Sequence, residues 1–202
     1  MKLDLASVCV WTACLALAAC SLPRSSLGSG LRAGDDSPAF DPVHVWGPDR
    51  GSHACPMCKY GNHPGVLLWV NSERLDAITP ITRRLDEEVA RRSADEFRAF
   101  IIFTNPAHRT TTDVEARLTA WAERAGLRHV AVAHVPSPTD SRSAALYRLN
   151  PDPSVSTVAI VYDQRKVVAT FTNVESDQTA IAALLAAVDR AEASSPSRNG
   201  SR

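Results

Sequence analysis

Continuous apolar runs of strand length alternate with segments of helical periodicity along most of the chain, and this alternation restricts the fold most. Residues 65–70 form an unbroken apolar run, typical of a strand that is buried on both faces. Apolar residues then recur at helical spacing, at Leu75, Ile78, Ile81, Leu85 and Val89. The same criteria predict further strands at 97–103, 128–135, 155–162 and 166–172, and further helices at 112–126, at 141–149 and after a cap at Ser176 or Asp177.

The order of these elements predicts an α/β fold. Strand–helix–strand connections are right-handed and give parallel neighbours, whereas the last two strands should form an antiparallel hairpin around residues 163–165. This order resembles the thioredoxin-like fold, in the longer form found in peroxiredoxins and membrane-anchored thiol reductases. The resemblance implies a three-layer sandwich over residues 41–190. It would have a mixed sheet of about five strands, with helices on both faces.

The N-terminus has the pattern of a bacterial lipoprotein signal peptide. Residues 1–19 contain Lys2 and then an apolar stretch of roughly fifteen residues, which is too short to span a bilayer. The stretch ends in Leu17-Ala18-Ala19-Cys20, which resembles the lipobox. In such proteins the Cys receives diacylglycerol and acyl chains such as palmitate. The alternative is an ordinary signal peptide that is cut nearby and leaves Cys20 unmodified.

Lipidation of Cys20 would anchor the protein to a membrane of the bacterial cell envelope without spanning it, facing the periplasm or the exterior. The segment 20–40 is rich in Ser, Gly and Pro, which predicts a flexible tether behind the lipidated Cys. Residues 191–202 are polar and predict a disordered tail. The chain has 22 basic and 22 acidic residues, and this zero net charge argues against a nucleic-acid partner.

The usual active site of thioredoxins is missing from the matching position. Their active-site helix carries a Pro eight residues after the first Cys of a CxxC motif. Pro80 resembles that Pro, and counting back eight residues gives Ser72, so the segment 72–75 reads Ser-Glu-Arg-Leu. The cis-Pro that faces this site in thioredoxins is replaced by Ser156. Ordinary thioredoxin chemistry is therefore not expected there.

A CxxC motif lies elsewhere, at Cys55-Pro56-Met57-Cys58, before the first predicted core strand. This position predicts a site at the N-terminal edge of the sheet. Cys9 and Cys14 leave with the signal peptide and Cys20 is assigned to lipid, so Cys55 and Cys58 are the remaining pair. Export places them in a compartment that permits disulfides.

Three functions fit this pair. In the first, the protein is a thiol–disulfide oxidoreductase without a cofactor and acts on a protein thiol or disulfide partner. Cys55 would attack and Cys58 would resolve, while His53 and Lys59 lower the thiolate pKa. In the second, His53, Cys55, Cys58 and His63 bind copper or zinc. In the third, the pair is a small structural disulfide in a non-catalytic scaffold for a protein partner.

Overall fold

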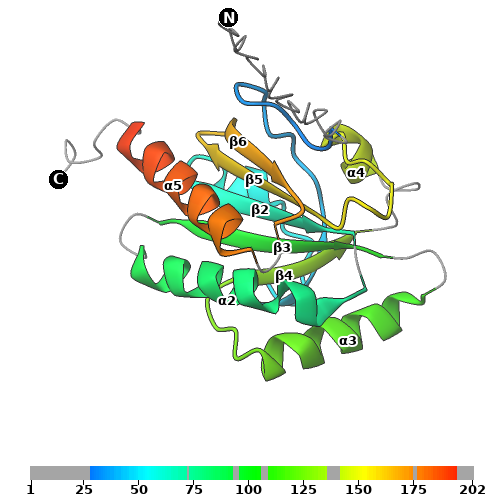
Figure 1. Ribbon diagram of the computed structural model, residues 1–202. Coiled ribbons are helices and arrows are strands. Elements are labelled where there is room, and N and C mark those ends of the chain that lie inside the picture. The colour runs from blue at the N-terminus through cyan, green and yellow to red at the C-terminus, as the bar shows by residue number, and fades with distance from the viewer. Residues whose placement is uncertain are drawn as a thin grey trace, which may run out of the picture.

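The computed structural model describes residues 28–71, 73–92, 96–105, 109–135, 142–174 and 177–194. A single mixed sheet of six strands, in the order β1-β4-β3-β2-β5-β6, organises this part of the chain (Figure 1). The strands are β1 (Val43–Trp46), β2 (Gly65–Val70), β3 (Arg98–Thr104), β4 (Ala131–Val135), β5 (Thr157–Asp163) and β6 (Lys166–Thr172).

Strand β2 lies inside the sheet, between β3 and β5, and all six of its residues are buried. It pairs in parallel with β3, which pairs in parallel with β4. On its other side β2 pairs antiparallel with β5, and β5 forms an antiparallel hairpin with β6. The predicted strand directions are therefore confirmed.

Three long helices cover one face of the sheet: α2 (Leu75–Arg91), α3 (Thr111–Arg124) and α5 (Gln178–Ser194) (Figure 1). The apolar stripe predicted for α2 is buried in the core on this face. Helix α2 begins at Leu75 and contains Pro80 in its interior, and the Thr79 hydroxyl donates to the Leu75 carbonyl. Thr110 caps α3 by accepting a hydrogen bond from the Asp113 N–H.

The opposite face is covered by short elements. Helix α1 (Pro56–Tyr60) contributes Met57 to a second apolar cluster, and Tyr147 joins that cluster directly after helix α4 (Arg142–Leu146). Phe40 packs against both Trp69 and Tyr147, with ring centroids 5.1 and 5.3 Å away. Helices therefore lie on both faces, as the thioredoxin-like fold requires.

The predicted tether is wrong over its second half. From Leu31 to Ser37 the chain runs beside β6: the Gly34 N–H donates to the Val167 carbonyl, and the Val167 N–H donates to the Asp35 carbonyl. Leu31 and Phe40 are buried in the second apolar cluster. These two side chains can remove apolar area from water only by packing on the sheet, which is why the segment is ordered despite its Ser, Gly and Pro content. We call residues 28–42 the N-terminal strap.

The number of strands and the end of the last helix also differ from the sequence predictions. The sheet has six strands instead of about five, because the strap leads into β1, a short edge strand antiparallel to β4. Helix α5 extends to Ser194, beyond the predicted start of the tail at 191. Ala191 is buried, and Glu192 pairs with Arg92 of α2. In the part of the chain that the structure describes, no helix combines the length and apolarity needed to cross a bilayer.

Candidate redox site

Cys55 and Cys58 form a disulfide with their Cα atoms 5.2 Å apart, inside the usual range for such bonds. Cys55 is the N-cap of α1, and its Sγ accepts a hydrogen bond of 3.0 Å from the Cys58 N–H. Pro56 is well suited to the first turn of α1 because that position needs no N–H donor. The motif thus builds a short helix that the sequence analysis did not predict.

The two cysteines differ in exposure. Cys58 is exposed to solvent, whereas Cys55 is partly buried and packs against the second apolar cluster. Met57 between them is almost fully buried and fixes α1 to the sheet. An incoming thiol therefore reaches Cys58 more readily than Cys55. The sequence analysis gave the attacking role to Cys55 and the resolving role to Cys58, whereas this exposure favours Cys58 as the sulfur that meets the partner.

Lys59 follows Cys58 and is not an isolated cation. Its Nζ lies 2.5 Å from Asp49 Oδ1, and Asp49 is buried while Lys59 is half exposed. The hydrogen bond to Asp49, and next the one to Tyr60, hold the pKa of Lys59 above its usual range. Burial alone would raise the pKa of Asp49, but hydrogen bonds from Lys59 and Tyr60 outweigh it and lower that pKa. The paired carboxylate cancels much of the stabilisation that Lys59 was expected to give a thiolate.

His44 of β1 holds the other side of the motif. Its Nε2 lies 2.9 Å from the carbonyl oxygen of Ala54, the residue just before Cys55. The carbonyl can only accept, so Nε2 carries the hydrogen in this contact. His44 is almost completely buried and packs edge-on against Phe100. The backbone entering Cys55 is thus held by a buried side chain of β1.

The side chains of the metal alternative are not gathered into a site. The two sulfurs are bonded to each other, and His63 Nδ1 lies 2.7 Å from Glu96 Oε2. His53 is exposed. Within the described residues, no group of three or more His, Cys, Asp or Glu side chains is arranged to hold a metal ion.

The motif lies at the N-terminal edge of the parallel strands, as the sequence predicted. The Arg165 N–H, in the turn between β5 and β6, donates to the carbonyl of Gly61 at the end of α1. Gly65 then starts β2. A residue with a side chain does not fit at position 65 without a shift of its neighbours, because an added Cβ would lie 2.4 Å from the Tyr162 hydroxyl and 2.8 Å from the Arg98 carbonyl.

The opposite edge, where thioredoxins carry their active site, is occupied by an ion cluster. Glu73 pairs with Arg109 and Arg117. Ser72 lies outside the described residues, and the described residues contain no cis peptide bond. Sequence reasoning missed this cluster, because its members come from three separate segments. Their positions just after β2, just before α3 and within α3 were the available signal.

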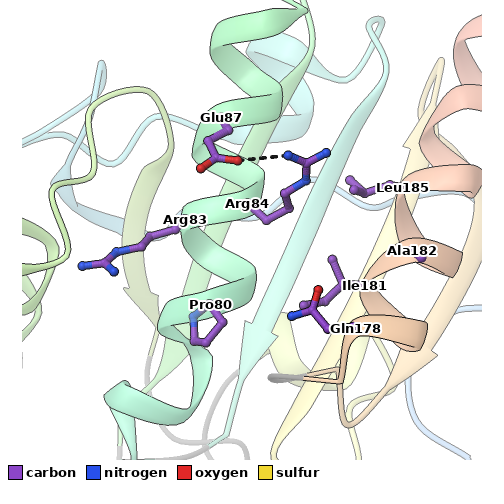
Figure 2. Close-up of a pocket in the computed structure, with 8 residues that line it drawn as sticks. All are labelled: Pro80, Arg83, Arg84, Glu87, Gln178, Ile181, Ala182 and Leu185. Carbon is purple, nitrogen blue, oxygen red and sulfur yellow. Dashed lines mark hydrogen bonds and ion pairs between the residues drawn. The ribbon is translucent and has the colours of Figure 1, made fainter.

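A groove between α2 and α5 has a volume of about 460 Å³ (Figure 2). Its residues, which include the Arg84–Glu87 ion pair at 3.0 Å, are Pro80, Arg83, Arg84, Glu87, Gln178, Ile181, Ala182 and Leu185. None of them is a Cys, His or Met that could act as a nucleophile or bind copper or zinc. The disulfide therefore remains the stronger candidate site.

Comparison with solved structures gives clear relatives in fold. A candidate protein disulfide isomerase from Bacteroides thetaiotaomicron aligns with a TM-score of 0.60 and 15% identity, over 83% of this chain and 95% of its own. A candidate thiol:disulfide interchange protein DsbE from Chlorobium tepidum aligns with a TM-score of 0.60 and 14% identity, over 80% of this chain and 99% of its own. Peroxidoxin BcpB from Mycobacterium tuberculosis aligns with a TM-score of 0.58 and 16% identity, over 79% of this chain and 97% of its own.

These alignments establish a thioredoxin-like fold, in agreement with the sequence prediction. Neither the protein-family models nor the curated proteins give a match to the sequence. At identities of 14 to 16% the likeness concerns the fold, and the function must be argued from the site.

Proposed function

We propose that the protein is an exported thiol–disulfide exchange protein whose redox centre is the Cys55–Cys58 disulfide. The observation that carries the proposal is an accessible disulfide at the start of a short helix, with Cys58 exposed and Cys55 partly buried. Exchange requires an attacking thiolate to reach a sulfur in line with the bond, and the exposure of Cys58 favours attack there.

The exchange follows from this asymmetry. A thiolate of the partner attacks Cys58 Sγ, a bond forms between these two sulfurs, and the Cys55–Cys58 bond breaks. Cys55 leaves as a thiolate, and the Cys58 N–H that contacts its Sγ at 3.0 Å stabilises the new charge. A second thiol of the partner then attacks the partner sulfur that is bonded to Cys58 in the mixed disulfide. The partner becomes a disulfide, Cys58 is released, and the pair has taken up two electrons without a cofactor.

We propose further that the protein is attached by a lipid on Cys20 to a membrane of the bacterial cell envelope. Cys20 lies outside the described residues, so the support is the Leu-Ala-Ala-Cys motif at the end of an apolar signal-like stretch. Replacement of Cys20 by Ala should release the protein from the membrane fraction. Mass spectrometry of the N-terminal peptide should find acyl chains in the wild type alone. An unmodified N-terminus in the wild type would contradict the anchor.

Trapping of the mixed disulfide tests the redox proposal. The chain from Ser21 onward keeps all described residues, and its cysteines are Cys55 and Cys58. Its Cys55→Ser variant retains the exposed sulfur and should form a mixed disulfide with a protein disulfide substrate. The matched Cys58→Ser variant should form it at least about tenfold more slowly, because its remaining thiol is shielded. Equal and negligible trapping by both variants would leave the pair structural and the fold a scaffold.

A further inference from the structure

A groove with a volume of about 380 Å³ lies at the N-terminal edge of the sheet, and the last residue of α1 forms part of its wall. Pro48 and Tyr60 line one side of it. Arg98 comes from the start of β3, and Arg128 and His129 from the loop before β4. Val89 and Ala90 of α2 complete the wall.

The charged side chains that line this groove, Arg98 and Arg128, are both cationic. No acidic residue lines it. Asp86 contacts the same loop, but it is buried, and its Oδ1 accepts the backbone N–H groups of residues 128, 129 and 130 at 2.7 to 3.0 Å. Across the part of the chain described by the structure, no ion pair of Arg98 or Arg128 is found. These two guanidinium groups give the lining of the groove a positive charge.

Tyr60 connects the groove to the disulfide. It is the last residue of α1 and comes two positions after Cys58. The Arg98 guanidinium carbon lies 5.6 Å from the centre of its ring, and Lys59 Nζ lies 5.0 Å from the same centre. The helix that exposes the sulfur thus forms one wall of the cationic groove.

Positive charge continues beyond the groove along the same edge. Arg165 is exposed in the turn that binds the end of α1, and Arg50 is exposed in the loop after β1, its guanidinium 5.9 Å from the Trp46 ring centre. Arginines from several separate segments therefore lie along the sheet edge that carries α1. This spread exceeds what a single small thiol would contact and matches a polypeptide segment.

We propose that this cationic edge binds acidic residues that flank the reactive cysteine of a polypeptide partner. The inference rests on the proposed function and gives it a substrate class. Carboxylates of the partner would occupy the groove of Arg98 and Arg128 and place the partner's sulfur at Cys58. The attraction acts mainly on the association rate and weakens as salt is added.

The test uses the Cys55→Ser variant of the chain from Ser21 onward. Its substrates are peptides whose single Cys is activated as a 2-pyridyl disulfide, flanked by Glu, by Ser or by Lys. Cys58 attacks the peptide sulfur, the peptide–Cys58 disulfide forms, and thiopyridone leaves and is followed by its absorbance. Each rate is divided by that of the same peptide with 2-mercaptoethanol, which removes differences in intrinsic reactivity.

We expect the Glu peptide to react at least about tenfold faster than the Ser peptide at low salt, and the Lys peptide to react more slowly than both. Arg128→Glu, at an exposed position, should remove most of this preference, and Arg98→Glu should act in the same direction. Arg142→Glu is the matched control, because Arg142 is exposed at the start of α4. It should leave the ratio unchanged.

Equal normalised rates for the three peptides would overturn the groove proposal while leaving exchange at Cys58 intact. A preference that persists in Arg128→Glu and Arg98→Glu would also overturn it. Glutathione activated in the same way separates a small carboxylate-bearing thiol from a polypeptide. A rate for glutathione above that of the Glu peptide would contradict the polypeptide assignment. No reaction with any substrate would overturn the proposed function itself.

Discussion

Lys59 Nζ contacts the buried carboxylate of Asp49 at 2.5 Å, so the cation next to the exposed cysteine is already paired. This relationship neutralises the charge of Lys59, which the sequence analysis expected to lower the thiolate pKa. It also makes the reactivity of the reduced pair dependent on both residues. The two charges can be removed one at a time, with opposite expected effects.

Asp49→Asn should leave Lys59 as an uncompensated cation and lower the pKa of the Cys58 thiol. Alkylation of the reduced protein at pH 7 should then accelerate roughly threefold, as expected for one charge near the surface. Lys59→Gln should slow alkylation by a similar factor, because Asp49 then stands alone. The measurement is the rate with iodoacetamide in a Cys55→Ser background. Changes of the same sign in both variants would show that the ion pair does not control the thiolate.

The N-terminal strap is expected to be part of the domain's stability. Phe40→Ala should lower the free energy of unfolding by about 3 to 4 kcal/mol, because the ring is buried against Trp69 and Tyr147. Urea denaturation of the chain from Ser21 onward measures it. Ala39→Gly, at an exposed neighbour, is the control and should change stability by less than about 1 kcal/mol. A similarly small decrease in the free energy of unfolding for both variants would mean that residues 28–40 act only as a tether.

Gly65→Ala should destabilise the domain by about 2 to 3 kcal/mol through overpacking, because the new Cβ meets the Tyr162 hydroxyl and the Arg98 backbone. Gly28→Ala is the matched control, since no atom lies within 4 Å of its Cβ position. Thermal or urea unfolding of both variants decides the point. A Gly65→Ala protein as stable as Gly28→Ala would mean that β2 and β5 shift apart without loss.

The pH dependence of stability should report on His134 of β4. Burial lowers its pKa, Glu115 at 3.4 Å opposes that effect, and His53 adds to it. The unfolded chain therefore binds a proton near pH 6.5, where the folded protein still does not. Unfolding free energy should fall as pH drops from 6.5 towards the folded pKa, with a slope of up to about 1.4 kcal/mol per pH unit.

His134→Gln removes this titrating group and should flatten the decline. Urea unfolding of both proteins at several pH values between 5 and 8 measures the difference, with the span chosen around the ordinary His pKa of about 6.5. Parallel curves for wild type and variant would assign the pH dependence to other groups.

Much of the fold was predictable because burial determines periodicity. Residues 65–70 had to be a central strand, since a continuous apolar run needs cover on both faces, and 166–172 was predicted with the observed bounds. Strand β1 and the strap were missed because their order comes from single anchors, Leu31, Phe40 and Val45, that show no period. Short segments held by distant partners carry little local signal.

The candidate site was predictable in identity and not in geometry. Counting cysteines isolated Cys55 and Cys58, and chain order placed them at the N-terminal edge of the sheet. Their relative exposure depends on Met57 entering the core, which no spacing rule reveals. The contacts of Asp49 and His44 with the motif join positions ten residues apart and depend on how the loop after β1 folds back.

The reduction potential of the Cys55–Cys58 pair tests the central claim most directly. The chain from Ser21 onward is equilibrated with defined ratios of reduced and oxidised glutathione or dithiothreitol, and the thiols are counted by mass after alkylation. We predict a reversible couple between about −120 and −270 mV, the span of known catalytic dithiols. A potential below about −300 mV would make the disulfide structural and contradict the account.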